Sequence, residues 1–186
     1  KENKWIRKTN LLLIARQNGK THLARIRILA GLFIFGERSI VAMSSNRGMA
    51  LDTFRKVCDV IEENALLANQ VKQIRVANGQ ESLELLSGAR YEIVAATRDG
   101  SRGKTADLLF VDELREISDE AWKAARPTTR ATGGMTFTCS NAGDYFSTVL
   151  NELRESALSY PSKSFGWYEY SAPQHCKIHD KKAWAM

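Results

Sequence analysis

The stretch from residue 11 to residue 33, LLLIARQNGKTHLARIRILAGLF, decides how the rest of the chain is interpreted. Its first part, Leu11–Ala15, is an apolar run typical of a buried strand. From Lys20 to Phe35 the apolar residues recur at helical spacing. Between the two lies ARQNGKT, at residues 15–21. A loop of this composition between a strand and a helix predicts a phosphate-binding loop.

The predicted loop binds phosphate through its backbone as well as its side chains. The N–H groups of the loop and of the helix start point into one concavity and donate to phosphate oxygens. Gly19 lets the backbone approach closely, Lys20 reaches the β- and γ-phosphates, and the Thr21 hydroxyl is a ligand for Mg²⁺. Ile14 stands where the usual G-x-x-x-x-G-K-[ST] pattern has a glycine. An ordinary strand–turn–helix corner is therefore the alternative.

A second motif, DLLFVDE at residues 107–113, is an apolar strand that ends in two carboxylates. Open α/β sheets bind their ligands at the carboxyl ends of the strands. We expect Asp112 to hold Mg²⁺ opposite Thr21, and Glu113 to orient or deprotonate the attacking water. The alternative is that Asp112 caps a turn and Glu113 faces solvent. Together with GKT, this motif predicts a nucleoside triphosphatase.

A third segment, TFTCSNAG at residues 136–143, is a strand that ends in small polar residues. When such a strand is inserted between the two phosphate motifs, its polar tip can contact the γ-phosphate and sense hydrolysis. Ser140 and Asn141 are the candidates for this role. The alternative is that they form a turn that caps a helix starting at Asp144.

Strand-like and helix-like segments alternate along the whole chain. Further strands are predicted at Ser39–Ser44, Val71–Ala77, Ser82–Leu86, Glu92–Ala96, Leu108–Val111, Met135–Cys139 and Ser164–Tyr170, and further helices at Ala50–Ala68, Asp119–Arg126 and Asp144–Leu158. The Asn78-Gly79 pair predicts a hairpin between two of these strands. The pattern predicts an α/β fold with a mostly parallel central sheet flanked by helices.

Composition narrows the classes of function. With 186 residues, 44% hydrophobic and 26% charged, the chain has the size and make-up of one globular domain. A formal net charge of +6 permits a polyanionic partner, and the candidate cations for DNA contact are Arg47, Lys56, Lys72 and Arg75. No apolar run is long enough to span a bilayer, so no membrane association is expected. The short HCKIH segment, with His175, Cys176 and His179, is a weak zinc candidate.

Four segments together resemble the ATPase domain of the large terminase subunit of tailed bacteriophages, especially the HK97-like group. They are ARQNGKT, SSNRGMALDTF at 44–54, TRDGSRGKTADLLFVDE at 97–113 and TCSNAG at 138–143. The resemblance implies an ASCE-type P-loop fold and the use of ATP and Mg²⁺ to translocate double-stranded DNA into a procapsid. It also implies a homo-oligomeric ring, expected to be a pentamer, with the portal protein and the small terminase subunit as partners. The location would be the host cell cytoplasm, at the procapsid portal during assembly.

The resemblance also assigns individual residues. Arg16 matches an arginine inside the family's phosphate loop and is expected to act in catalysis; Gln17 and Asn18 complete the nucleotide-binding loop. Arg102 matches the position from which a neighbouring subunit supplies an arginine finger, an effect of about 10³–10⁵ in rate in other NTPases. The alternative for Arg102 is a flexible surface loop at residues 99–103.

Two departures from the family pattern shape the expected boundaries. Only a short segment precedes the phosphate loop, where the family carries an adenine-contacting motif, and the acidic cluster of the family's nuclease domain is absent. We therefore expect residues 1–172 to form the ATPase domain and residues 173–186 to begin a linker toward a nuclease domain that is not in this sequence, so the chain should not cleave DNA. Two other functions stay open: a helicase-like DNA-dependent ATPase core, and a nucleotide-gated DNA-binding or assembly module with little turnover.

Overall fold

The structure is a computed structural model that describes residues 5–77, 79–173, 176–177 and 179–182. Its elements are, in chain order, β1 (Thr9–Ile14), α1 (Lys20–Phe33), β2 (Ser39–Ser44), α2 (Arg47–Glu62), α3 (Ala65–Ala68), β3 (Val71–Arg75), β4 (Ser82–Leu85), β5 (Arg90–Ala95), β6 (Leu108–Asp112), the 3-10 turn η1 (Leu114–Glu116), α4 (Asp119–Ala125), η2 (Arg126–Thr129), β7 (Met135–Ser140), α5 (Thr148–Ser159) and β8 (Phe165–Tyr170).

The strands form one eight-stranded sheet in the order β3-β4-β5-β2-β6-β7-β1-β8. Among these described strands, the pairs β3–β4 and β4–β5 are antiparallel and all others are parallel. The mostly parallel sheet and the antiparallel pairing of the predicted hairpin are confirmed, whereas Asn78 of its predicted turn lies outside the described residues. Strand β7 lies between β1, which precedes the phosphate loop, and β6, which carries the acidic pair. The polar tip of β7 is thus placed between the two phosphate motifs.

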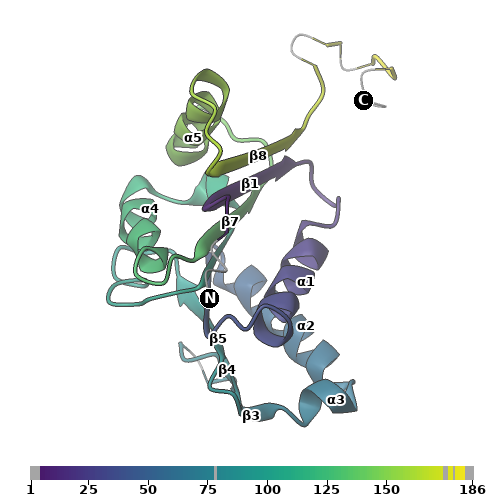
Figure 1. Ribbon diagram of the computed structural model, residues 1–186. Helices are drawn as coiled ribbons and strands as arrows, with labels where there is room; N and C mark the ends of the chain where they lie inside the picture. The colour runs from purple at the N-terminus through teal and green to yellow at the C-terminus, as the bar shows by residue number, and fades with distance from the viewer. Residues whose placement is uncertain (1–4, 78, 174–175, 178, 183–186) are drawn as a thin grey trace.

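Helices cover both faces of the sheet (Figure 1). Helices α1 and α2 pack on one face, and α4 and α5 pack on the other. Strand β6 shows why both faces are apolar: Leu108 and Phe110 join the first core, whereas Leu109 and Val111 join the second. A central strand buried in this way holds the residues at its end in a fixed position.

The strand register aligns the carboxyl ends of the central strands. Leu13 pairs with Ser140 between β1 and β7, and Ser44 pairs with Asp112 between β2 and β6. The loops that follow β1, β2, β6 and β7 therefore meet along one edge of the sheet. This edge is where a doubly covered parallel sheet binds its ligand.

Two predicted helices differ in extent from the structure. The helix predicted at 50–68 divides into α2 and α3, because the Asn64 side chain accepts a hydrogen bond from the Leu66 N–H at 3.0 Å and starts a new helix. The helix predicted from Asp144 begins at Thr148, since Asp144 accepts from the Phe146 N–H at 2.8 Å in a preceding turn. Within the described part of the chain, every helix is too short or too polar to cross a membrane.

Candidate nucleotide-binding site

The predicted phosphate loop lies between β1 and α1. Gly19 is the N-cap of α1 with a φ of +79°, a left-handed conformation that glycine adopts without strain. No described side chain caps this helix, so its first N–H groups stay available to a ligand. The Asn18 amide braces the loop by donating to the carbonyls of Ala15 and Arg16, at 3.3 and 2.9 Å. The loop has the geometry of an anion-binding helix start.

The missing first glycine of the motif has a local explanation. Ile14 is still part of β1, so its backbone needs no left-handed conformation. The chain reverses instead at Gln17, with a φ of +60°, and at Gly19. Gln17 and Glu113 are the two non-glycine residues with positive φ in the described part of the chain, and both line one cavity. Backbone strain of this kind concentrates at functional sites.

That cavity has a volume of about 900 Å³ and lies at the carboxyl edge of the sheet. Its walls are Arg16, Gln17, Gly19, Lys20 and Thr21 from the phosphate loop, Ser45, Asn46, Arg47, Gly48 and Met49 from the start of α2, and Glu113, Arg115, Glu116 and Asn141 from the loops after β6 and β7. The structure thus brings the phosphate loop, the predicted base and one predicted sensor residue into a single cavity.

A series of hydrogen bonds joins the phosphate loop to the acidic motif. The Lys20 amine donates to Asn141 Oδ1 and also to the carbonyls of Ile14 and Ala15, at 3.3 and 3.1 Å. Asn141 Nδ2 then donates to Glu113 Oε1 at 3.0 Å. Asn141 is almost buried, so its amide is held in this bridging orientation. The residue connects the phosphate-binding cation to the predicted base.

Arg115 is a charged neighbour of Glu113 that the sequence pattern did not indicate. Its Nε lies 3.4 Å from Glu113 Oε2, and one of its terminal nitrogens lies 3.0 Å from Glu116 Oε1. Glu113 Oε2 is buried and accepts no hydrogen bond in the described structure, so its acceptor capacity is unused there. Arg115 stands two residues after Glu113 in the sequence, and this spacing is the signal that could have indicated their contact.

The two predicted sensor residues have different positions. Asn141 lines the cavity, whereas Ser140 is fully buried and its Oγ accepts from the Arg115 N–H at 3.1 Å. Ser140 therefore supports the backbone behind Glu113. The turn that follows is built by Asp144 and Ser147, whose Oγ accepts from the Asp144 N–H at 3.1 Å.

Thr21 and Asp112, the predicted Mg²⁺ ligands, line a smaller cavity of about 290 Å³ together with Asp52 and Thr53 of α2. Burial, and next the charge of Glu113, raise the pKa of Asp112, while the Glu113 N–H and the Lys20 charge act in the opposite direction. A buried carboxylate that is costly to ionise, beside a hydroxyl and a second carboxylate, offers the hard oxygen donors that Mg²⁺ prefers. The residues present fit this ion.

Arg47, a candidate for DNA contact, lines the wall of the nucleotide cavity. One of its guanidinium nitrogens is 2.5 Å from Glu81 Oε1. Glu81 is only 1% exposed, and its Oε2 has no hydrogen-bond partner in the described structure. The contact therefore ties the start of α2 to the β3–β4 hairpin.

The other three candidate cations for DNA contact lie on the surface away from this cavity. Lys56 pairs with Asp52 along α2 at 2.5 Å, and Lys72 pairs with Glu84 across the hairpin at 2.6 Å. Arg75 is exposed at the end of β3, an edge strand of the sheet. DNA contact at these three positions, as at Arg47, stays a prediction.

Arg102 lies in the loop between β5 and β6 and does not line the nucleotide cavity of its own chain. Its side chain is 63% exposed and pairs with Asp99 at 3.1 Å. It lines a separate cavity beside α4. The catalytic role of Arg102 stays a prediction.

The weak zinc candidate cannot be placed as a set, because His175 lies outside the described residues, as do parts of the predicted linker at 173–186. Among the residues that are described, no group of three His, Cys, Asp or Glu side chains could hold a metal ion.

Three solved structures have the same fold as this chain. The large terminase of bacteriophage HK97 has a TM-score of 0.85 and 22% identity, and the match covers 96% of this chain and 38% of that protein. The large terminase ATPase domain of Thermus phage P74-26 has a TM-score of 0.69 and 19% identity, covering 89% and 76%. The large terminase of another thermophilic bacteriophage, in complex with ATP-gamma-S, has a TM-score of 0.63 and 12% identity, covering 89% and 40%.

Sequence comparison gives the family directly. No curated protein matches the chain. A family model described as terminase large subunit, ATPase domain, matches residues 3–164, which is most of the sequence. This match agrees with the sheet order, in which a strand is inserted between the two phosphate motifs as in an ASCE P-loop fold. The chain therefore belongs to the family of terminase large subunit ATPase domains.

Proposed function

We propose that this chain hydrolyses ATP with the aid of Mg²⁺ and that hydrolysis drives double-stranded DNA into a viral procapsid. The observation that carries the proposal is the bridge from Lys20 through Asn141 to Glu113, which joins a phosphate loop to a mostly buried carboxylate in one cavity. The family to which the chain belongs supports it, and the large terminase of a thermophilic bacteriophage with the same fold has been solved both with ATP-gamma-S and with ADP.

The roles follow from position. The N–H groups at the start of α1 and the Lys20 amine hold the phosphates, and Arg16 adds positive charge at the mouth of the cavity. Thr21 and Asp112 would hold Mg²⁺, which neutralises charge on the β- and γ-phosphates. Glu113 accepts a hydrogen bond from the attacking water and takes its proton.

Asn141 is suited to sense the γ-phosphate. A phosphate that draws the Lys20 amine away from Asn141 Oδ1 frees the amide and, through Nδ2, loosens its hold on Glu113. Occupation of the phosphate site and orientation of the base are coupled by this one side chain. Ser140 contributes by fixing the backbone at Arg115.

In the proposed assembly, copies of the chain form a homo-oligomeric ring, taken to be a pentamer. The ring acts with the portal protein and the small terminase subunit in the host cell cytoplasm. The exposed position of Arg102, outside its own nucleotide cavity, favours action on the nucleotide of a neighbouring subunit. Completion of the site by a neighbour also predicts that the ATPase rate rises steeply with protein concentration, with and without double-stranded DNA.

The test is Glu113→Gln, which keeps the hydrogen bond from Asn141 but removes the base. ATP binding, measured with a fluorescent analogue, should persist, while turnover falls on the order of 10²–10⁴-fold. Lys20→Ala is the matched control and should lose nucleotide affinity itself. Near-normal turnover by the Glu113→Gln protein would contradict the assignment.

A further inference from the structure

Arg115 lies in the 3-10 turn η1, which follows the acidic pair at the end of β6. Its side chain is 26% exposed and lines the nucleotide cavity. Acceptors of the same chain surround the guanidinium: Glu113 Oε2 lies 3.4 Å away, Glu116 Oε1 lies 3.0 Å away, and the Ala142 carbonyl accepts a hydrogen bond at 3.4 Å. The guanidinium is therefore directed at protein acceptors before any nucleotide enters.

The neighbouring strand β7 holds Arg115 in place. The Arg115 N–H donates to the Oγ of Ser140, a fully buried residue at the end of this strand, at 3.1 Å. The guanidinium donates to the carbonyl of Ala142, two residues further along. The turn η1 is thus attached at two points to the segment that ends β7, and both attachments are made by one residue. A side chain anchored in this way can fix the position of its neighbours.

Glu113 needs such a support because of its backbone. It has a φ of +49°, a left-handed conformation that is unfavourable for a residue with a Cβ. Its N–H donates to Asp112 Oδ1 at 3.0 Å, which stabilises the bend after β6. A strained residue of this kind persists where the surrounding structure holds it. The contacts of its side chain are therefore part of what keeps the predicted base in the cavity.

The two oxygens of the Glu113 carboxylate are held in different ways. Oε1 accepts a hydrogen bond from the Asn141 amide at 3.0 Å. Oε2 faces Arg115 Nε, and both of these atoms are buried and make no hydrogen bond in the described structure. The contact at Oε2 is thus an attraction between charges without the directional requirement of a hydrogen bond. It can persist while the carboxylate rotates by a small angle.

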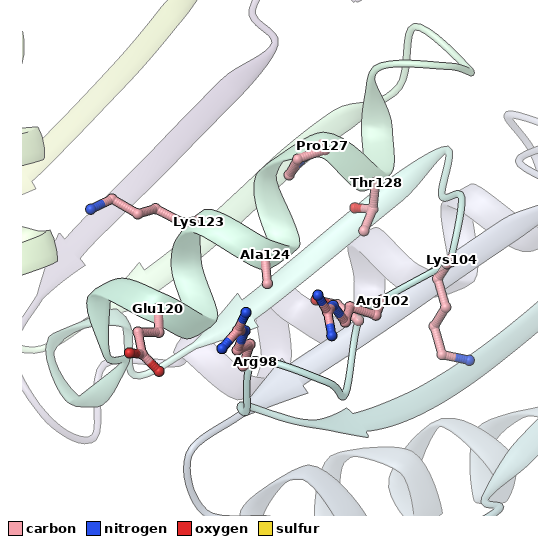
Figure 2. Close-up of a pocket in the computed structure, with 10 residues that line it drawn as sticks. Arg98, Arg102, Lys104, Glu120, Lys123, Ala124, Pro127 and Thr128 are labelled. Carbon is pink, nitrogen blue, oxygen red and sulfur yellow. The ribbon is translucent and has the colours of Figure 1, made fainter.

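The positive charge opposite Glu113 comes from Arg115. Among the residues that the structure describes, Arg115 is the one cation within ion-pairing distance of this carboxylate. Arg47 lines the same cavity but is paired with a different carboxylate. Figure 2 shows Arg98 and Arg102 beside α4, where they line a separate cavity. Within one chain, these other arginines therefore do not replace Arg115.

We propose that Arg115 is a positioning residue for Glu113, and that it keeps the carboxylate in the nucleotide cavity while the hydrogen bond from Asn141 changes. This role rests on the proposed function, in which Glu113 is the base and a phosphate draws Lys20 away from Asn141. When the Asn141 bond weakens, Oε1 is free to turn, whereas Oε2 stays beside the guanidinium. The base then rotates about a fixed point and keeps the alignment that catalysis requires.

The alternative role for Arg115 is direct contact with the phosphates. Two carboxylates, those of Glu113 and Glu116, share its one guanidinium. A group made of two carboxylates and one guanidinium repels a triphosphate more than it attracts one. The arrangement therefore favours an effect of Arg115 on the base over an effect on nucleotide binding.

Steady-state ATPase kinetics of the full chain with Mg²⁺, at one fixed protein concentration, test this role. Arg115→Met keeps the length of the side chain but removes its charge, so kcat should fall on the order of 10–10²-fold, as when a catalytic group is slightly misplaced. KM for ATP should stay within about twofold of the wild-type value, because the phosphate contacts are unchanged. Arg115→Lys returns a positive charge to this position and should recover part of the lost kcat.

The matched control is Arg154→Met. Arg154 also pairs with a carboxylate, that of Glu169 at 3.0 Å, but it lies on α5 and does not line the nucleotide cavity. This variant should keep the wild-type kcat even if loss of the ion pair lowers its Tm. If Arg115→Met melts below the assay temperature, Arg115→Lys carries the test, and a lower kcat at an unchanged KM is expected.

A double variant shows whether Arg115 acts through Glu113. In single-turnover assays, Arg115→Met should slow the Glu113→Gln protein no further, since positioning has no effect once the base is gone. A further loss as large as in the wild-type background would mean that Arg115 acts on the nucleotide directly, and would overturn the proposal. A raised KM with an unchanged kcat would do the same.

Failure of the proposal and failure of the proposed function give different results. A wild type that hydrolyses ATP, together with an Arg115→Met protein of equal kcat, refutes the positioning role alone. A wild type that does not hydrolyse ATP refutes the proposed function and, with it, the role of Arg115.

Discussion

Replacement of Asp112 by Asn should stabilise the protein while abolishing its Mg²⁺-dependent activity. The wild-type carboxylate is 7% exposed and lies beside Glu113, and burial together with that charge raises its pKa. The Asn side chain retains an oxygen that can accept from the Glu113 N–H, a bond that Asp112 Oδ1 accepts at 3.0 Å. The substitution therefore removes the cost of a buried charge without removing a hydrogen bond.

The change in folding stability follows from the linkage between protonation of Asp112 and folding. Because the folded state raises the pKa of Asp112, the unfolded chain ionises first as pH rises, and wild-type stability falls from about pH 4 upward to the raised pKa. One pKa unit corresponds to about 1.4 kcal/mol. Each kcal/mol moves Tm by about 2–4 °C in a chain of this size. We expect the variant to melt higher at neutral pH, by about 3–6 °C for each unit by which folding raises the pKa of Asp112, and equally below pH 4.

The assay is thermal unfolding by circular dichroism across this pH range, with and without Mg²⁺ and ADP. Mg²⁺ with ADP should raise the Tm of the wild type more than that of the variant, since only the wild type keeps the charged ligand. Asp52→Asn is the control: Asp52 lines the same small cavity but is exposed, so its replacement should not raise Tm. A variant that is less stable at neutral pH, or a difference that does not vary with pH, would refute this account of Asp112.

Two further predictions concern Arg102 and Arg47. If Arg102 acts on a neighbour, an Arg102→Ala protein should regain ATPase activity on mixing with the Lys20→Ala protein; no gain where mixed oligomers demonstrably form would count against that role. Arg47→Ala should leave the buried Glu81 carboxylate without its ion-pair partner and lower the free energy of unfolding by about 2 kcal/mol. This loss is smaller than that for a fully buried pair, because Arg47 is half exposed. Chemical denaturation should then show Glu81→Gln restoring part of that loss in the double variant.

Much of the fold could be predicted because its signals are local. The strand predicted at Ser39–Ser44 matches β2, since an apolar run there stands between a polar turn and a capped helix. The alternation of apolar strands with helices along the sequence also indicated a mostly parallel sheet. The division of a helix at Asn64 was missed, because its capping hydrogen bond competes with helix formation at a position that the apolar period does not mark.

The candidate site was only partly predictable, because local sequence patterns do not determine the order of the strands in the sheet. The phosphate loop, Asp112 and Glu113 carry recognisable spacing. The start of α2 does not, and Arg47 enters the nucleotide cavity because β2 lies next to β6. Arg115 was missed for a related reason, since its contact with Glu113 depends on the 3-10 turn that follows β6.

The hydrogen bonds within the nucleotide cavity also indicate how binding and chemistry are linked. Lys20, Asn141 and Glu113 lie at the ends of three neighbouring strands, and in the structure each satisfies the next. The Lys20 amine also donates to two loop carbonyls, so a phosphate that engages it has to replace one of these three hydrogen bonds. If the replaced bond is the one to Asn141, the Asn141 amide is free to turn and its bond to Glu113 weakens. The coupling that we propose is this case, in which loss of the bond to Asn141 reorients Glu113 when the phosphate site fills.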